Sequence, residues 1–355
     1  MKNFYKNKRV LITGATGFKG AWLSQWLLIL GAKITGLGYN PNQNKNLFYK
    51  LGLNKKIDIN LFDIRDYTKL KKLLNKTRPQ IIFHLAAQPL IYESYKKPHL
   101  TFDINFRGTL NLLDISRNIS SVKSIVVVTS DKCYESNNSS KGFKENDLLG
   151  GVDPYSASKS STELMVRAYR ETFFKSKINS GLSTARAGNV IGGGDWSTKR
   201  LIPDCIRSLL RKKTIMIRNP NFNRPWQHVL EPLRGYLVLA KNQYINPKKY
   251  SSAWNFGTKP NTLTTVHNIV KYIINFWGSG KIKIKKSKFY EQENLQLNIK
   301  KSKKYLNWYP AYNIKDGVEI TTDWYYRVFI KKESPSIVTI DQIKKYQDES
   351  KFNKN

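Results

Sequence analysis

Residues 10–20 read V-L-I-T-G-A-T-G-F-K-G, an apolar run that leads directly into glycines at positions 14, 17 and 20. The run Val10–Thr13 is typical of a buried strand, and apolar residues at helical spacing follow from Trp22 to Leu30. Glycines at such a junction let backbone amides approach a pyrophosphate, and the following helix points its positive end at it. Three glycines alone also fit a plain tight turn, but their place between the first strand and the first helix favours a dinucleotide-binding site.

Strand-like and helix-like segments alternate through the first half of the chain. This alternation predicts an α/β fold, a Rossmann-like, doubly wound parallel sheet. The expected strands are Val10–Thr13, Ile34–Leu37, Ile57–Leu61, Ile81–Leu85, Ile125–Thr129, Leu182–Ala185 and Ala253–Phe256. We expect residues 1–189 and 225–261 to form the dinucleotide-binding domain, 190–224 and 262–330 to form a smaller, mixed substrate-binding lobe, and 331–355 to be a charged C-terminal tail.

The 355 residues include 61 basic and 25 acidic side chains, a formal charge of +36. The lysines are spread along the whole chain, so a Lys/Asn/Ile-rich composition explains the charge without a nucleic-acid partner, although a positive field would attract an anionic small substrate. No apolar run approaches the roughly 18 residues of a membrane span. The first strand begins too early to leave room for a signal peptide. Two cysteines, Cys133 and Cys205, predict neither a disulfide framework nor a metal site, so we expect a cytoplasmic protein.

The glycine spacing G-x-x-G-x-x-G resembles that of the short-chain dehydrogenase/reductase superfamily. The resemblance implies a tyrosine and a lysine four residues apart after the fifth strand, and D-P-Y-S-A-S-K supplies Tyr155 and Lys159. Four residues along a helix place both side chains on one face. A neighbouring ammonium and a positive nicotinamide ring favour the phenolate, so we expect the pKa of Tyr155 to fall from its usual value near ~10. Tyr155 would then take the proton of a sugar hydroxyl.

The stretch T-S-D-K-C-Y after the fifth strand resembles the same loop of the nucleotide-sugar 4,6-dehydratases, most of which carry Thr-Asp-Glu there. Its Ser-Asp-Lys version, with T-G-F-K-G, G-N-V-I-G-G-G-D-W and R-P-W-Q-H-V, is similar to the CDP-glucose 4,6-dehydratases of that family. The resemblance covers roughly residues 5 to 330. It implies oxidation at C4 of a glucose ring, loss of water across C5 and C6, and hydride return to C6, so CDP-glucose is the expected substrate.

Three loop residues receive roles from this resemblance. Ser130 belongs to the catalytic group. Asp131 is the candidate acid for the departing O6 hydroxyl, for which burial should raise its pKa, and the alternative is that it only caps the loop. Lys132 stands where the relatives carry the glutamate that removes H5. It is either a neutral, desolvated base or a charged residue that stabilises the enolate or holds the cofactor. Cys133 is expected to be a packing residue.

The implied cofactor is NAD. The residues expected to contact it are Gly14, Thr16, Gly17, Phe18, Lys19, Gly20, Asn40, Asp63, Ile64, Leu85, Ala86, Ala87, Asn105, Thr129, Tyr155 and Lys159. NAD-binding folds usually carry an acid about 20 residues beyond the glycines, which binds the ribose and repels a 2′-phosphate. Here no acid precedes Asp58, and Asn40 stands where the aspartate of the family would fall. Asn40 predicts a weak preference for NAD+ over NADP+.

The residues expected to contact the substrate lie mostly in the second half of the chain: Gln88, Arg186, Asn189, Gly194, Asp195, Trp196, Leu201, Ile202, Arg224 and His228. For His228 a structural role is an equal alternative, and lobe packing is the alternative for the stacking of Trp196 or Trp226 on the base. We expect a homodimer through the helices that contain Asn105 and Tyr155. Rival functions are another nucleotide-sugar 4,6-dehydratase, a 4-epimerase, or a non-catalytic protein that senses dinucleotides.

Overall fold

A seven-stranded parallel sheet forms the centre of the computed structural model, which describes residues 1–355 except 40–45, 136–141, 176–178, 261, 285–295 and 353–355. The strand order is β11-β6-β5-β4-β1-β2-β3. The bounds are β1 Arg9–Thr13, β2 Lys33–Gly38, β3 Asp58–Leu61, β4 Ile81–His84, β5 Ser124–Val128, β6 Gly181–Arg186 and β11 Ala253–Asn255. The predicted doubly wound α/β sheet is confirmed, because the chain order reverses at β1 and all neighbouring strands run parallel.

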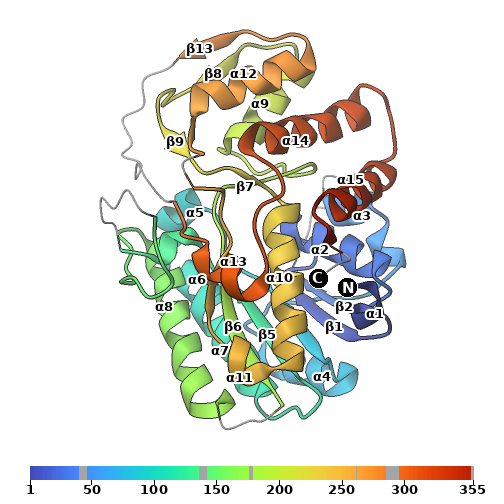
Figure 1. Cartoon of the computed structure of the whole chain (residues 1–355), viewed down its shortest axis with the longest axis vertical. Coiled ribbons are helices and arrows are strands. Elements are labelled where there is room, and N and C mark those ends of the chain that lie inside the picture. Colours follow the sequence, from blue (N-terminus) through green and yellow to red (C-terminus); the bar gives the residue numbers. More distant parts are fainter. Residues whose placement is uncertain (40–45, 136–141, 176–178, 261, 285–295, 353–355) are drawn as a thin grey trace.

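Helices cover both faces of the sheet (Figure 1). Alternate residues of a strand face opposite layers. In β5, Val126 packs in the core with α2 (Phe18–Ile29) and α10 (Leu230–Ile245), whereas Val127 packs in the core with α4, α7 and α8. The second set has the bounds α4 Tyr67–Thr77, α7 Gly108–Ser116 and α8 Pro154–Tyr169. Burial on both faces explains why the central strands β1, β4 and β5 are mainly apolar runs without polar alternation.

The smaller lobe stands above the carboxyl ends of the strands and appears in the upper half of Figure 1. It contains α9 Leu201–Leu210, α12 Val266–Trp277 and α14 Ile314–Phe329, with the short pairs β7–β10, β9–β12 and β8–β13. Their bounds are β7 Val190–Ile191, β8 Ile215–Ile217, β9 Asn223–Arg224, β10 Gln227–His228, β12 Thr264–Thr265 and β13 Ile282–Ile284. Helix α13 (Lys300–Leu306) packs on α10 and β11 instead, so assigning all of 262–330 to the lobe is wrong at this helix.

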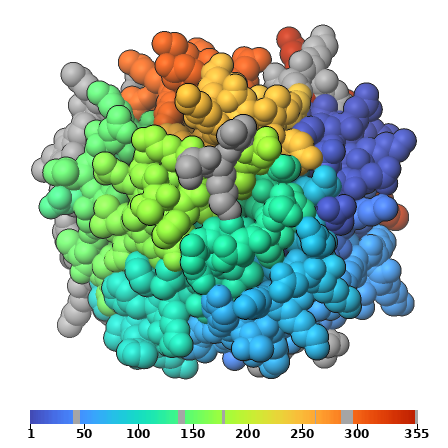
Figure 2. Space-filling model, turned by 90° about the horizontal axis from the view of Figure 1, so that it is seen from below, coloured from blue at the N-terminus to red at the C-terminus, as the bar shows by residue number. Residues whose placement is uncertain are grey.

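The remaining short elements connect these layers. They are α1 Lys2–Tyr5, α3 Leu47–Lys50, η1 Leu53–Lys55, α5 Ile91–Lys96, α6 Pro98–Phe102, η2 Asp103–Arg107, η3 Asp131–Cys133, η4 Arg170–Phe174 and α11 Pro247–Tyr250. Seen from below, segments from the cyan and green parts of the chain, which include α7 and α8, cover the face opposite the lobe (Figure 2). Among the helices of the described residues, none is both long and apolar enough to cross a bilayer.

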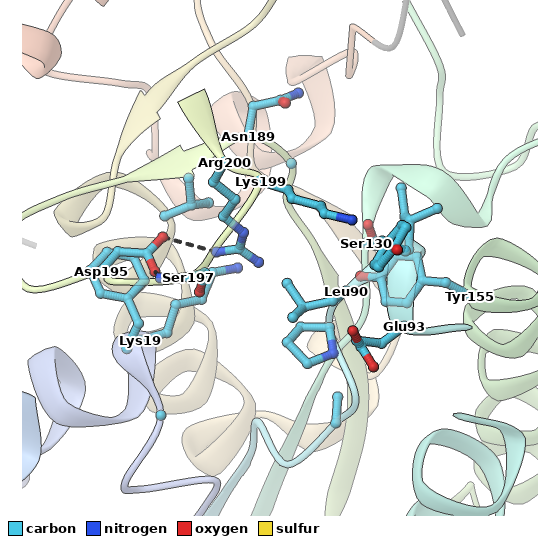
Figure 3. A pocket seen from close by; sticks show the side chains of 18 of the residues that line it. Lys19, Leu90, Glu93, Ser130, Tyr155, Asn189, Asp195, Ser197, Lys199 and Arg200 are labelled. Carbon is cyan, nitrogen blue, oxygen red and sulfur yellow. Dashed lines mark hydrogen bonds and ion pairs between the residues drawn. The ribbon is translucent and has the colours of Figure 1, made fainter. Parts of the chain in front are cut away.

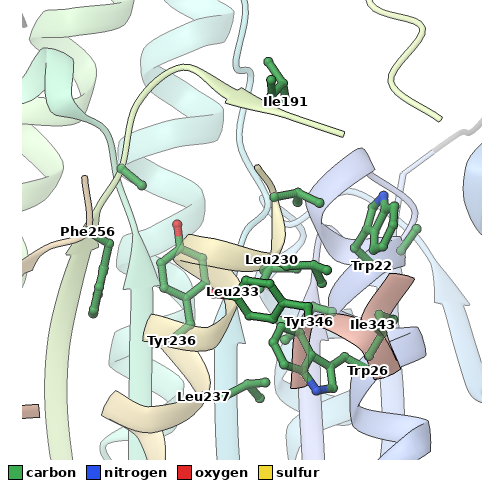
Figure 4. Close-up of a cluster of buried hydrophobic side chains, with 14 of the residues drawn as sticks. Trp22, Trp26, Ile191, Leu230, Leu233, Tyr236, Leu237, Phe256, Ile343 and Tyr346 are labelled. Carbon is green, nitrogen blue, oxygen red and sulfur yellow. The ribbon is translucent and has the colours of Figure 1, made fainter. Parts of the chain in front are cut away.

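The prediction of a C-terminal tail is wrong for residues 335–352. Residues Pro335–Glu349 form helix α15, which packs against α2 and α14. Its buried residues recur at helical spacing and include Val338, Ile343 and Tyr346. Of these, Ile343 and Tyr346 lie beside Trp26 (Figure 4). The many charged residues lie on the opposite face, so the composition concealed an amphipathic helix.

Candidate active site

A cavity of about 1360 Å³ lies where the carboxyl ends of the strands meet the lobe. Its walls come from the turn after β1, the loops after β4, β5 and β6, the start of α8, and residues 197–205 and 216–219 of the lobe. Figure 3 shows the side chains that point into it, Tyr155 on one side and Lys19 and Arg200 on the other. It occupies the switch point of the sheet, between β1 and β4, which is the usual ligand site of this architecture.

The turn between β1 and α2 has the geometry of an anion-binding loop. Gly14 has a φ of +74°, and a Cβ there would lie 2.7 Å from the backbone N of Ala86. A Cβ on Gly20 would lie 2.1 Å from the backbone O of Gly14, so the helix can approach the strand only without side chains. No side chain caps the N-terminus of α2 at Gly17, and the first residues of this helix line the cavity. These features fit the pyrophosphate of a dinucleotide.

The residues expected to contact the cofactor line this cavity, with two exceptions. Asn40 lies outside the described residues. Asn105 is buried behind the wall, where its Oδ1 accepts from the backbone N of Gln88 at 2.8 Å and its Nδ2 donates to Ser158 Oγ at 2.9 Å. Asn105 therefore fixes the loop after β4 to α8 and does not itself face the ligand.

Tyr155 and Lys159 lie on one face of α8 and both line the cavity. Asp153 caps this helix by accepting from the backbone N of Ser156 at 2.9 Å. Burial lowers the pKa of Lys159 to about 8. Burial also raises the pKa of Tyr155 to about 12, and a hydrogen bond with Ser130 opposes this rise. The expected lowering of the Tyr155 pKa is therefore not produced by the groups of the protein itself and requires the charge of a bound ligand.

Ser130, Asp131 and Lys132 all line the cavity. The capping role belongs to Ser130, which begins the short helix η3 and whose Oγ accepts from the backbone N of Lys132 at 3.2 Å. Ser130 Oγ also donates to Asp131 Oδ1 at 2.8 Å, and only 3% of Asp131 is exposed. The carboxyl group is thus buried at the cavity wall, as an acid for a departing hydroxyl requires. Lys132 is half-buried, and Cys133 is a buried packing residue as predicted.

Five of the residues expected to contact the substrate line the cavity: Asn189, Asp195, Leu201, Ile202 and Arg224. The other five, Gln88, Arg186, Gly194, Trp196 and His228, lie outside its lining. Gln88 donates from Nε2 to the backbone O of Leu90 in its own loop at 3.1 Å and to Thr101 Oγ1 on α6 at 2.9 Å. Gly194 packs against Leu47. The side chain of Trp196 packs edge-on against Tyr325, with ring centroids 5.2 Å apart.

Arg186 belongs to a buried polar network behind the sheet edge. Its Nη2 donates to Glu163 Oε2 at 2.7 Å and its Nη1 to the hydroxyl of Tyr134 at 2.7 Å. Burial alone would raise the pKa of Glu163, but the charge and hydrogen bond of Arg186, with bonds from Thr129 and Thr184, lower it overall. The assignment of Arg186 to the substrate is therefore wrong: its charge is already neutralised away from the cavity.

His228 is also structural. The residue is buried, and its ring meets Trp22 edge-on with centroids 5.8 Å apart. Burial lowers the pKa of its imidazole to about 3, so the ring is neutral at physiological pH. Among the described residues, no group of three His, Cys, Asp or Glu side chains is arranged to hold a metal ion.

Several cavity residues were missed from the sequence. Lys199 and Arg200 precede α9, and Arg200 Nη1 pairs with Asp195 Oδ2 at 3.0 Å (Figure 3). Tyr92 and Glu93 on α5 line the wall near Leu90. In a lysine-rich chain, two further cations do not stand out as site residues. The only clue in the sequence was that Lys199 and Arg200 directly precede the expected contacts Leu201 and Ile202.

Comparisons with known proteins place this geometry in context. The model of the GDP-mannose 4,6-dehydratase family matches residues 11–321. CDP-glucose 4,6-dehydratase of Salmonella typhimurium is 39% identical over 97% of this chain and 98% of its own length. The crystal structure of dTDP-glucose 4,6-dehydratase from Bacillus anthracis with NAD matches with a TM-score of 0.74, 22% identity, and coverage of 90% of this chain and 96% of that one.

UDP-glucose 4-epimerase of Thermotoga maritima, solved with UDP-glucose, matches with a TM-score of 0.78 and 22% identity, over 91% of this chain and 99% of that one. Matches at this identity show the same fold and no more. The family model covers most of the chain, and the Salmonella relative is similar over nearly its full length. The chain belongs to the GDP-mannose 4,6-dehydratase family of nucleotide-sugar-modifying enzymes.

Proposed function

We propose that the chain is an NAD-dependent 4,6-dehydratase that converts CDP-D-glucose to CDP-4-keto-6-deoxy-D-glucose. The observation that carries this proposal is the position of Asp131 and Lys132 in the same cavity wall as Tyr155 and Lys159. A 4-epimerase needs no acid for O6, whereas this chain buries one beside the oxidation pair. The 39% identity to the Salmonella CDP-glucose 4,6-dehydratase supports the choice of substrate.

The residues divide the chemistry as follows. Bound NAD+ supplies the hydride acceptor and donor. Lys159 and Tyr155 hold the proton of the sugar O4, with Lys159 favouring the phenolate once a ligand is bound. Asp131 gives a proton to the departing O6 hydroxyl, and Ser130 orients it through the 2.8 Å bond to Oδ1. Lys132 is either the base for H5 or a fixed positive charge for the enolate.

We also propose an oligomeric state and a cellular location for the protein. A homodimer would form through α6, η2 and α8, which carry the exposed apolar side chains of Phe102 and Leu164. Helix α8 also carries Tyr155, so dimerisation would stabilise the catalytic helix. We further propose that the protein acts in the cytoplasm, since its two cysteines, Cys133 and Cys205, are unpaired.

Substrate profiling tests the proposed function. The purified protein is incubated with NAD+ and, separately, with CDP-, UDP-, dTDP- and GDP-glucose and GDP-mannose. The products are analysed by mass spectrometry for loss of water and by NMR for the configuration at C4. We expect a product lighter by one water, a 4-keto-6-deoxy sugar, from CDP-glucose first. Water loss from another nucleotide sugar alone would assign a different dehydratase. A product of unchanged mass with altered C4 configuration would assign an epimerase, and binding without conversion would assign a sensing protein.

A further inference from the structure

Two cations from different halves of the molecule meet in the cavity. Lys19 is the second residue of α2, in the glycine loop, and Arg200 immediately precedes α9 of the lobe. Figure 3 shows both side chains pointing into the cavity on the same wall, next to Asp195. Among the charged groups that act on the Lys19 ammonium, Arg200 has the largest effect, ahead of Lys159 and Asp131.

The charges of this pair are incompletely balanced. Arg200 has an ion pair with Asp195, but no described Asp or Glu forms one with Lys19. The pKa of Lys19 is lowered to about 8, mainly by burial and then by the positive charges of Arg200 and Lys159, while the charge of Asp131 opposes this fall. A partly buried ammonium beside another cation destabilises the folded protein, so such an arrangement calls for an anionic ligand.

The lobe holds Arg200 in place through a built scaffold. Asp195 Oδ1 accepts from the backbone N of Ser197 at 3.0 Å, and its backbone O accepts from the hydroxyl of Tyr325 at 2.6 Å. Asp195 engages only Nη1 of Arg200, at 3.0 Å. A guanidinium has five N–H donors, so the others remain for a ligand in the cavity.

The side chain of Lys19 and the backbone of its loop serve different ligand groups. The backbone amides at the start of α2 meet a pyrophosphate, whereas the side chain extends towards Arg200 on the lobe side (Figure 3). The ligand of the lobe, if the proposed function holds, is a nucleotide sugar whose two phosphates carry the charge that this pair lacks.

We propose that Lys19 and Arg200 together form a subsite for the diphosphate of the nucleotide-sugar substrate, with Lys19 reaching across from the cofactor-binding loop. This inference rests on the proposed function for the identity of the ligand. Because one of the two cations belongs to the glycine loop, the subsite joins the two halves of the protein through the substrate. Losing one charge-assisted contact of this kind weakens binding by about 10- to 100-fold.

The test uses Lys19→Met, with Lys33→Met as the control that loses the same charge at an exposed site on β2. Calorimetric titration measures CDP and NAD+ separately. We expect CDP to bind Lys19→Met about 10- to 100-fold more weakly and NAD+ to bind within about threefold of normal. In Lys33→Met both affinities should be unchanged. In turnover, KM should rise by more than kcat falls, because the diphosphate does not react.

Proton linkage gives a second readout. The groups that face Lys19 are Arg200, Lys159 and Asp131, and Asp195 acts through Arg200. An anion beside Lys19 raises its lowered pKa, so binding of CDP at about pH 8.5 should take up protons. Titrations in two buffers of different ionisation enthalpy measure this uptake. It should shrink in Lys19→Met and persist in Lys33→Met, whereas a purely structural lysine would leave it unchanged.

The outcomes separate this inference from the proposed function. Normal CDP affinity in Lys19→Met overturns the inference, as does a loss confined to NAD+, which would assign Lys19 to the cofactor. If the wild-type protein does not convert CDP-glucose, the proposed function fails. The subsite is then tested with UDP, dTDP and GDP, since the diphosphate is common to all of them. An equal loss for CDP and for phosphate-free cytidine would also contradict it.

Discussion

The carboxyl group of Asp131 lies directly against the backbone of Gly188, at the point where the loop after β6 passes the loop after β5. A Cβ on Gly188 would lie 1.7 Å from Asp131 Oδ2 and 2.1 Å from its Cγ. The glycine therefore sets the room available to the candidate acid. With the bond from Ser130 on the other oxygen, Asp131 is held from both sides.

This contact predicts that Gly188→Ala will displace Asp131 and slow the loss of water at least about 100-fold while leaving the first oxidation largely intact. A single-turnover experiment with CDP-glucose should show reduced cofactor and 4-keto-glucose accumulating. The preceding residue of this loop, Ala187, already carries a methyl side chain, so a methyl group is tolerated elsewhere in the same loop. Normal water loss in Gly188→Ala would show that the carboxyl group moves without consequence.

The division of labour between Tyr155 and Asp131 can be tested directly. Tyr155→Phe removes the group that takes the O4 proton, so reduced cofactor should not form. Asp131→Asn keeps the shape but cannot donate the proton, so reduced cofactor should form and persist. Absorbance of the reduced nicotinamide in stopped flow distinguishes the two variants. The absence of any reduced cofactor in a folded Asp131→Asn protein would remove Asp131 from its role as elimination acid.

Lys132 is the loop residue at which this site differs from the relatives that carry glutamate. We expect Lys132→Glu to impair turnover at least about tenfold, because the half-buried position is arranged for a cation and the substitution reverses the charge there. Steady-state turnover of CDP-glucose measures this, with Lys132→Arg as the variant that preserves charge. Near-normal activity of the glutamate variant would mean that the position is an interchangeable base for H5.

Arg186 is predicted to matter for stability and not for substrate affinity. Arg186→Met leaves the buried carboxylate of Glu163 without its cation, which costs about 3–5 kcal/mol of unfolding free energy. The double variant with Glu163→Gln should recover part of this loss. Because Arg186 lowers the pKa of Glu163, the stability from this pair is present at neutral pH and is lost as the pH falls below 4.5, the ordinary value.

Urea denaturation at pH values from neutral to acidic measures these changes, and CDP titration of the folded variant measures affinity. In Arg186→Met the pKa of Glu163 rises instead, so the acid sensitivity contributed by the pair should disappear. A variant of normal stability with lost CDP binding would return Arg186 to the substrate site.

The protein is expected to discriminate only weakly between NAD+ and NADP+. No acidic residue precedes Asp58, so the charge that normally repels a 2′-phosphate is missing from this part of the chain. We expect NAD+ to be preferred over NADP+ by less than about 100-fold, or ~2.7 kcal/mol. Calorimetric titration with both nucleotides measures this preference. A much larger preference for NAD+, or any clear preference for NADP+, would contradict the role given to Asn40.

The sheet and the catalytic pair could be predicted because they depend on local patterns. Apolar runs at regular intervals define the strands, and the spacing of Tyr155 and Lys159 defines one helix face. The direction in which a side chain points at the end of a strand cannot be predicted from such local patterns. Arg186 and Asn189 both follow the apolar part of β6, yet only Asn189 reaches the cavity, because Glu163 on α8 pairs with Arg186 behind it.

Partners distant in sequence also explain the other misses. His228 packs between Trp22 and Tyr312, neither of which is near it in the chain. The site cation Arg200 depends on a lobe loop whose position is fixed by Tyr325. Helix α15 was missed because its apolar face is visible only at helical spacing, while its overall composition is charged.

The docking of α15 has a consequence for the order in which the protein completes its fold during synthesis. Trp26 lies near the start of the chain, but Phe352 meets it with ring centroids 5.0 Å apart, and the hydroxyl of Tyr346 donates to the buried Glu231 at 2.6 Å. Until these late residues leave the ribosome, the nascent chain exposes an apolar surface over α2. The Glu231 carboxylate on α10 then keeps the backbone N–H groups of Ala311 and Tyr312 as donors but lacks the tyrosine hydroxyl. Chaperone binding is therefore expected to persist until residues 335–352 have emerged, and a chain stalled on the ribosome before residue 335 should remain sensitive to proteases.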